Sequence, residues 1–304
     1  MAAASNLRTR IITVAAVLPI PLVLFPFGPR LAVAAFLGVC LALCVLEMGL
    51  MVIPAFERKL APLEPEAHSP MPGETAMSRL PLRGYLFPGI AVLLGWAMLG
   101  AGVAETSATS VGGIAVASMV ALLVGSFSSH TIEVAAARAF GIAISLCYGA
   151  LPWLVVWQLY SLGSHARYVF LVMAITWLGD TGGYFGGRFL GGKVFGDRKL
   201  APRISPKKTW EGALGGLLLS VVGSCLMNLI FWQAFGSFLL VAKVAALGGI
   251  AGQLGDLVES TFKRFSGVKD SGTIFPGHGG FLDRVDGILF CAPTVWAILW
   301  YQLH

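Results

Sequence analysis

Residues 260–286 hold the densest group of chemically active side chains in the sequence. Their functional groups are ammonium, guanidinium, imidazole and carboxylate, and the main members are Lys263, Arg264, Lys269, His278, Asp283, Arg284 and Asp286. Basic groups bind phosphates, carboxylates bind hard cations, and the N–H groups of glycines such as Gly279 and Gly280 can approach an anion closely. This combination predicts a site where a phosphate-rich substrate is held together with a metal ion.

Three aspartates in and before this segment have the spacing of metal ligands. Asp283 and Asp286 are three residues apart, so their carboxylates project from one side of a predicted helix. Asp256 stands near the end of the preceding predicted helix, on the same face as Ser260 and Lys263. Mg²⁺ typically binds one or two carboxylates together with substrate phosphates. We therefore predict that Asp256, Asp283 and Asp286 are ligands of Mg²⁺.

Other interpretations of these residues stay open. Asp256 could form a structural ion pair with Lys263 or Arg264 at the end of its helix. Buried acidic residues can also form a proton pathway, although the basic residues around these aspartates favour phosphate. A lone histidine is often structural, but the glycines around His278 and the aspartates after it favour a place in the site.

A second polar segment covers residues 180–212. It contains the glycine-rich stretch that follows Asp180 and the run Ser205-Pro206-Lys207-Lys208-Thr209, which precedes a predicted helix. A hydroxyl, ammonium groups and a helix N-terminus together favour an anion. The glycines form neither a Walker loop nor a dinucleotide fingerprint. The basic residues could instead contact acidic lipid headgroups.

The elements that position these segments follow from composition. Hydrophobic residues make up 57% of the 304 positions and charged residues 12%, against about 25% charged in soluble domains. The chain is therefore expected to be an integral membrane protein. The five cysteines lie in apolar runs without ligand spacing, which disfavours zinc and disulfide frameworks. The net charge of +6 is concentrated in the polar segments, so nucleic acid is not an expected partner.

We expect an all-α, polytopic fold with about nine transmembrane helices, because a helical span needs roughly 20 apolar residues. The apolar runs are at about 10–27, 31–53, 85–104, 111–128, 139–160, 167–180, 211–233, 237–258 and 285–303. The sixth is short unless it continues past Asp180. The first could be a signal peptide, but the chain stays apolar beyond it, which favours an uncleaved helix. Glu47, inside the second run, could serve the site or bond to a neighbouring helix.

Charge distribution predicts the orientation. With a cytoplasmic N-terminus, all but Arg30, Arg167 and Lys243 of the 21 lysines and arginines lie in cytoplasmic segments, as the positive-inside rule requires. The polar loops 180–210 and 259–284 then lie on the same face. We expect one continuous membrane domain, with N-terminal helices in residues 1–165 and a catalytic region in residues 166–304.

Residues 260–286 resemble the C-terminal signature of the phosphatidate cytidylyltransferase family, also called CDP-diacylglycerol synthases. The signature contains a Ser, a Lys-Arg pair, a Lys-Asp pair, His-Gly-Gly and Asp-Arg-x-Asp, and every fixed position is present. Asp180-Thr-Gly and residues 205–212 also match habits of the family. Gly287 stands where relatives often carry Ser, and Asp197-Arg198 where a His or Lys pair is common, so nucleotide contacts could differ.

The resemblance implies transfer of a cytidylyl group from CTP to phosphatidic acid in the cell (inner) membrane, with the active site facing the cytoplasm. It also implies Mg²⁺ as cofactor, K⁺ as a possible second ion, and a homodimer. The implied catalytic residues are Asp256, Lys263, His278, Asp283 and Asp286. The implied substrate-binding residues are Asp180, Ser205, Lys207, Lys208, Thr209, Ser260, Arg264, Lys269, Gly279, Gly280 and Arg284.

Two other functions share features with this sequence. A CDP-alcohol phosphotransferase would begin its motif as Asp283-x-x-Asp286-Gly287 does, but Phe290-Cys291 replace its Ala-Arg and its later aspartates are missing. An ion-coupled transporter would carry polar groups near the membrane midplane and inverted repeats, and neither is clear in this sequence.

Overall fold

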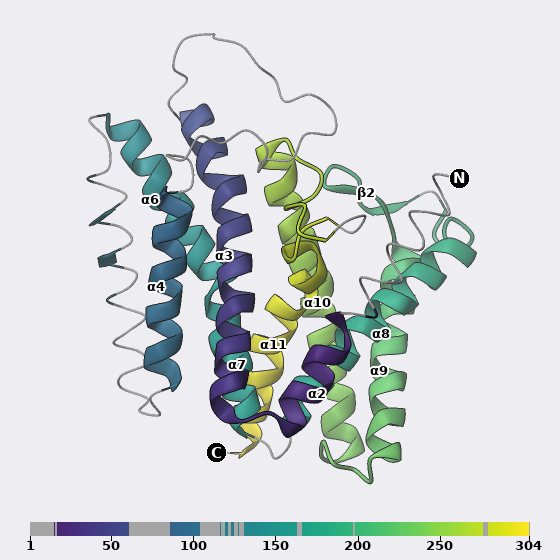
Figure 1. Ribbon diagram of the computed structural model, residues 1–304. Helices are drawn as coiled ribbons and strands as arrows, with labels where there is room; N and C mark the ends of the chain where they lie inside the picture. Colours follow the sequence, from purple (N-terminus) through teal and green to yellow (C-terminus); the bar gives the residue numbers. More distant parts are fainter. Residues whose placement is uncertain are drawn as a thin grey trace. The chain divides into compact units, whose positions relative to one another are not determined.

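The computed structural model is mainly helical in the part of the chain that it describes, with one short hairpin (Figure 1). It describes residues 15, 17–60, 86–103, 116, 119–120, 123–124, 127, 131–162, 166–196, 198–275 and 279–303. The chain divides into two compact units. One contains residues 1–157 and 262–284, and the other contains residues 158–261 and 285–304.

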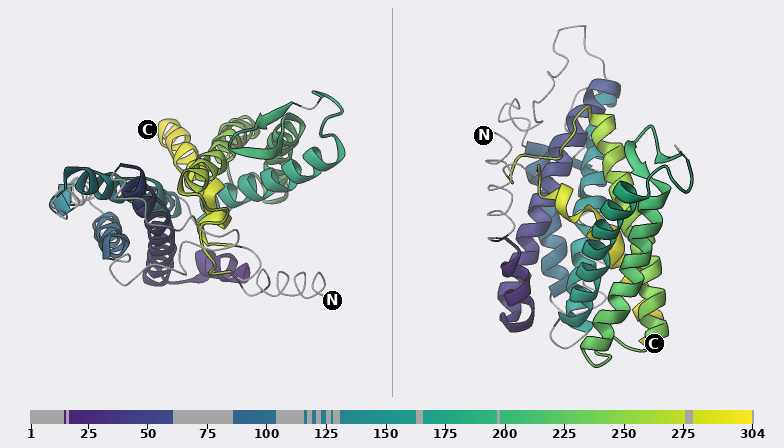
Figure 2. Two further views of the ribbon diagram at one scale, coloured as in Figure 1. Left: turned by 90° about the horizontal axis from the view of Figure 1, so that it is seen from above. Right: turned by 90° about the vertical axis from the view of Figure 1, so that its right-hand side faces the viewer.

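The first unit is organised around α3 (Arg30–Leu60), which packs against both α4 (Leu86–Val103) and α6 (Ile132–Gly149). Figure 2 shows these three helices side by side, seen nearly end-on in its left view. A Cβ atom at Gly149 would lie 2.9 Å from the backbone of Val45, so glycine is needed for α6 to approach α3 this closely. The short helices α2 (Pro19–Phe27) and α7 (Leu151–Leu162) complete the N-terminal part.

Residues 262–284 belong to the first unit because aromatic side chains join them to its helices. The ring of Phe265 lies 4.7 Å from that of Phe56 on α3, and Phe262 contacts Tyr148 on α6 with ring centroids 5.8 Å apart. Trp153 on α7 stacks on Phe281 at 6.2 Å. The end of α10 (Phe238–Ser266) and the loop after it are therefore held by the N-terminal helices.

The second unit contains a glycine-lined contact between α8 (Arg167–Phe189) and α9 (Trp210–Ile230). A Cβ atom at Gly182 would collide with the carbonyl oxygen of Gly215, and one at Gly186 would lie 2.7 Å from the carbonyl oxygen of Glu211. The glycines after Asp180 thus let two helix backbones touch, as small residues commonly do in membrane proteins.

The segment between α8 and α9 forms a two-stranded antiparallel hairpin, β1 (Lys199–Ala201) and β2 (Ser205–Thr209). Lys199 pairs with Thr209 and Ala201 with Ser205, with an irregularity between the two pairs. The sequence analysis predicted a polar loop here and no strands. A strand of three residues and one of five are too short to give a clear alternating pattern, and Pro206 obscures the second.

Four helical stretches in the described part of the chain are long and apolar enough to cross a membrane: Arg30–Leu60, Ile132–Leu162, Trp210–Ile230 and Phe238–Ser266. Large apolar side chains on α9 are exposed at four-residue spacing, at Leu214, Leu218, Val222, Leu226 and Ile230. Such a continuous apolar stripe on a surface is typical of contact with lipid. The expectation of an all-α membrane protein is confirmed at this level.

Individual predicted spans differ in their bounds. The helix at the predicted sixth span continues past Asp180, since α8 ends at Phe189, and the helix at the predicted ninth span is α11 (Leu282–Leu303). The predicted run 139–160 is divided by a break at Ala150 between α6 and α7. Most of the predicted span 111–128, the loop 61–85 and the start of the first span lie outside the described residues. The division at residues 165 and 166 stays a prediction.

The contact between α8 and α9 predicts that neighbouring glycines respond differently to one added methyl group. Gly182→Ala should lower stability by about 1–3 kcal/mol, because the methyl group collides with the backbone of α9. Gly183→Ala is the matched control, since its Cβ atom would find only an ordinary contact at 3.7 Å. Thermal unfolding of both purified variants in detergent measures the difference. Equal unfolding temperatures would contradict the close contact.

Candidate functional site

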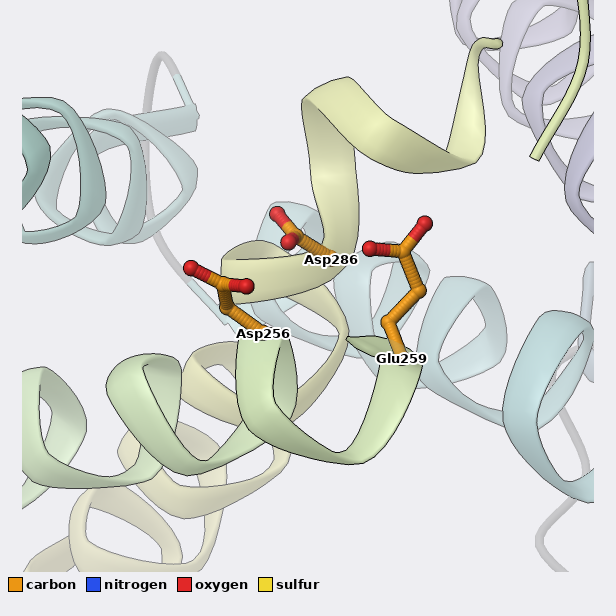
Figure 3. A group of neighbouring side chains, drawn as sticks. All are labelled: Asp256, Glu259 and Asp286. Atoms are coloured by element: carbon orange, nitrogen blue, oxygen red, sulfur yellow. The ribbon is translucent and has the colours of Figure 1, made fainter. Parts of the chain in front are cut away.

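Three carboxylates gather in the second unit. Asp256 and Glu259 come from α10 and Asp286 from α11, and one ligand atom of each lies within 4.8 Å of the others (Figure 3). Glu259 follows Asp256 by three residues, which places both on one face of α10. Glu259 is fully buried, whereas Asp256 and Asp286 are half-buried.

Glycine allows this cluster to form. A Cβ atom at Gly255 would lie 2.7 Å from the carbonyl oxygen of Asp286 and 3.0 Å from Phe290, so any larger residue would push α11 away from α10. A Cβ atom at Gly252 would likewise lie 3.3 Å from the carbonyl oxygen of Gly287. The small residues on α10 are therefore the reason that Asp286 reaches the two acids of the neighbouring helix.

Two further polar groups contact Asp256. The ammonium of Lys208, at the end of β2, forms an ion pair with Asp256 Oδ2. The hydroxyl of Ser260 donates to Asp256 Oδ1 at 3.4 Å, one turn along α10. The hairpin thus brings a cation to the edge of the carboxylate cluster.

The donor set of the cluster suits a hard cation. All its members are carboxylates, and no cysteine or histidine belongs to the group among the described residues. Oxygen donors of this kind are preferred by Mg²⁺ and Ca²⁺, whereas zinc sites usually contain sulfur or nitrogen. Three acids in such proximity also repel one another unless a cation neutralises part of their charge. The residues present therefore fit a divalent metal ion.

A second polar cluster lies in the first unit around Asp283. Its Oδ1 accepts from the Lys263 ammonium at 2.7 Å, and its Oδ2 accepts from the backbone N–H groups of Gly280 at 2.8 Å and Ser271 at 2.9 Å. Although burial by itself raises the pKa of the Asp283 carboxyl, Lys263 and these N–H groups hold that pKa below its ordinary value. Asp283 is therefore an anion surrounded by donors.

The backbone at Gly279 and Gly280 lies directly against this carboxylate. Gly279 has φ +83°, in the left-handed region where side chains are strained, and a Cβ atom there would lie 2.6 Å from Asp283 Oδ2. The Gly280 N–H, which the sequence analysis assigned to a substrate anion, is donated to Asp283. His278 lies outside the described residues.

The residues around the start of α9 have structural partners. Thr209 caps the helix by accepting from the N–H of Gly212 at 3.1 Å. Glu211 is buried, and its Oε1 accepts from the backbone N–H groups of Gly192 at 3.0 Å, Val194 at 3.3 Å and Phe195 at 3.0 Å. This carboxylate fixes the loop after α8 and thereby the approach to the hairpin.

The other predicted substrate-binding residues are distributed over both units. Asp180 on α8 and Lys207 on β2 are exposed in the second unit, and Ser205 on the same strand is half-buried. Arg264, Lys269 and Arg284 are exposed in the first. The basic residues among them are therefore exposed to solvent.

The structure brings together two of the three predicted metal ligands. Asp256 and Asp286 lie with Glu259, while Asp283 lies in the first unit with Lys263. The sequence analysis missed Glu259, although its three-residue spacing from Asp256 was a usable signal. The roles of all these residues stay predictions.

Comparison with known proteins gives the family of the chain. Residues 8–302 match the model of the cytidylyltransferase family. A protein of Staphylococcus saprophyticus subsp. saprophyticus named phosphatidate cytidylyltransferase is 41% identical over 152 residues, which are 50% of this chain and 55% of that protein. A Pseudomonas aeruginosa protein of the same name is 43% identical over 132 residues, 43% of this chain and 47% of that protein.

The matching stretch therefore spans about half the length of these curated relatives. The family match is much longer and runs from the first predicted span to the end of α11. On that extent, the chain belongs to the cytidylyltransferase family.

Proposed function

We propose that this protein transfers the cytidylyl group of CTP to phosphatidic acid, forming CDP-diacylglycerol and pyrophosphate. The observation that carries the proposal is the carboxylate cluster of Asp256, Glu259 and Asp286 with the Lys208 ammonium beside it. A cluster of this kind, on apolar helices, suits a reaction between a nucleoside triphosphate and a membrane lipid. The names of the relatives, which are phosphatidate cytidylyltransferases, support the same reaction.

The chemistry needs no side-chain nucleophile. An oxygen of the lipid phosphate, already an anion, attacks the α-phosphorus of CTP, and a new P–O bond forms. The bond between the α-phosphorus and the oxygen bridging to the β-phosphorus breaks, and pyrophosphate leaves with the electron pair. Charge builds up on the transferring group and on the leaving oxygens, so catalysis depends on positioning and on positive charge.

The residues of the second unit can meet both needs. Lys208 and Lys207 stand at the end of β2 and would neutralise phosphate oxygens. Asp256, Glu259 and Asp286 would hold Mg²⁺, which when bound would neutralise charge on the phosphates and orient them. Lys263, Asp283 and His278 are kept as catalytic residues on the strength of the signature that they share with the family. K⁺ is proposed as a second ion.

We further propose the arrangement in the membrane. The chain would cross the cell (inner) membrane about nine times with its N-terminus in the cytoplasm, and the polar loops would face the cytoplasm, where CTP is available. The distribution of Lys and Arg residues supports this orientation. A homodimer is proposed from the family resemblance alone.

The reaction is tested directly with purified protein. Protein in detergent or nanodiscs is given phosphatidic acid and radiolabelled CTP, and both CDP-lipid and pyrophosphate are measured. We expect the two products in equal amounts, only with a divalent cation, and most with Mg²⁺. Absence of CDP-lipid with every divalent cation would sink the assignment, and CTP hydrolysis without CDP-lipid would indicate a different acceptor.

The carboxylate cluster predicts that substitutions of its members change the kinetics in different ways. Asp286→Asn and Asp256→Asn should each lower kcat by at least about 100-fold, because removal of a charged group at a transferring phosphoryl group typically costs several kcal/mol. Glu259→Gln should raise the Mg²⁺ concentration needed for half-maximal activity. Glu133→Gln, an exposed acid on α6, is the control and should keep wild-type kinetics. Full activity in the Asp256 and Asp286 variants, with normal unfolding temperatures, would place the metal elsewhere.

A further inference from the structure

Glu47 lies in the middle of α3 and is fully buried. An ionisable side chain at such a place costs free energy unless donors surround it, and it usually has a function. Among the described residues, the donors of Glu47 are Ser271, Phe281 and Leu282, more than 200 positions away in the sequence. This acid therefore joins an N-terminal helix to the segment that carries the Asp283 cluster.

Two of these donors are backbone N–H groups at the start of α11. Phe281 N–H donates to Glu47 Oε1 at 3.0 Å, and Leu282 N–H donates to Glu47 Oε2 at 2.8 Å. The first N–H groups of a helix have no acceptor within the helix, and a negative charge beside them is favourable. Glu47, a residue of another helix, thus caps the N-terminus of α11. Helices usually receive such a cap from a residue of their own first turn.

The third donor connects Glu47 to Asp283. The hydroxyl of Ser271 lies 2.8 Å from Glu47 Oε2 and 3.1 Å from Asp283 Oδ2, so its one hydrogen is available to either carboxylate. Asp283 in turn holds Lys263. A displacement of Glu47 would therefore be transmitted through a single side chain to both members of the Lys263–Asp283 pair.

The glycines nearby make room for the Glu47 carboxylate. A Cβ atom at Gly272 would collide with Glu47 Oε1, and one at Gly280 would collide with both Glu47 Oε2 and Ser271 Oγ. The backbone is folded directly onto the carboxylate.

We propose that Glu47 is a positioning residue for the reaction: its carboxylate holds the Ser271 loop and the first turn of α11, and thereby sets the geometry of Lys263 and Asp283. This rests on the proposed function, since Lys263 and Asp283 are catalytic residues only within it. The sequence left open whether Glu47 serves the site or merely bonds to a neighbouring helix, and its three donors assign it to the site.

The test compares Glu47→Gln with Leu41→Ala in the full chain. Leu41 is also fully buried on α3, but its side chain packs against α4 near Gly95, so its truncation lowers stability without touching residues 271–283. Glutamine keeps the shape of Glu47 and loses the charge and one acceptor. We expect kcat to fall about 10- to 100-fold, as for other residues that orient reactive groups, with the KM for CTP changed by less than about threefold.

Hydrogen–deuterium exchange measured by mass spectrometry gives a readout that does not depend on activity. In Glu47→Gln the amides of residues 271–283 should exchange faster than in wild type, while those of α8 and α9 should not change. Leu41→Ala should leave residues 271–283 protected. If wild-type protein makes no CDP-lipid, the proposed function fails, and the exchange rates still decide whether Glu47 holds this segment.

Several results would overturn the proposal. Wild-type kcat in Glu47→Gln would do so, and so would unchanged exchange at residues 271–283. If Leu41→Ala lowers the unfolding temperature as much as Glu47→Gln does, and lowers kcat at least as much, then Glu47 is only a structural residue. Should Glu47→Gln fail to fold, Ser271→Ala decides, since it removes only the shared hydroxyl. It should lower kcat and loosen the same amides, and unchanged values of both would contradict the proposal.

Discussion

Buried charge is the constraint on which this structure depends. In a chain with 57% hydrophobic residues, a carboxylate away from water must receive donors or a cation, because an isolated charge in an apolar environment is very costly. Asp283 accepts from Lys263, the Ser271 hydroxyl and two backbone N–H groups, and Glu47 accepts from the Ser271 hydroxyl and two backbone N–H groups at the start of α11. Glu47 is thereby tied to a segment distant in the sequence, and the two acids together hold Ser271 and the start of α11 in place.

Close backbone contact is the second requirement. Gly255 lets α11 approach α10 closely enough for Asp286 to join Asp256 and Glu259, and Gly182 lets α8 lie directly on α9. In lipid, helices gain little from burying apolar side chains against each other, so small residues that permit dense packing take over that role. The glycines after Asp180, which match no nucleotide-binding motif in the sequence, are used in this way.

The cluster around Asp256 and the cluster around Asp283 differ in their balance of charge. Asp256, Glu259 and Asp286 form an anionic cluster with one nearby cation, suited to a metal ion and to phosphates. Asp283 has its charge already matched by Lys263. Two aspartates three residues apart on one helix thus have different electrostatic surroundings, because the first lies in the capping turn of α11 and the second faces α10.

The sequence by itself determined the membrane class, most of the long helices and the two polar segments, because these depend on local composition and on the regular spacing of residues along a helix. It also predicted that Asp256 and Asp286 act together, and the structure brings their carboxylates together, while their role as metal ligands stays a prediction. It did not reveal the break at Ala150, the hairpin, the partner of Asp283 or the place of Glu47. Those were decided by tertiary structure, since Glu47 takes donors from residues more than 200 positions away and Asp283 pairs with Lys263 on the preceding helix, contacts that no local pattern in the sequence shows.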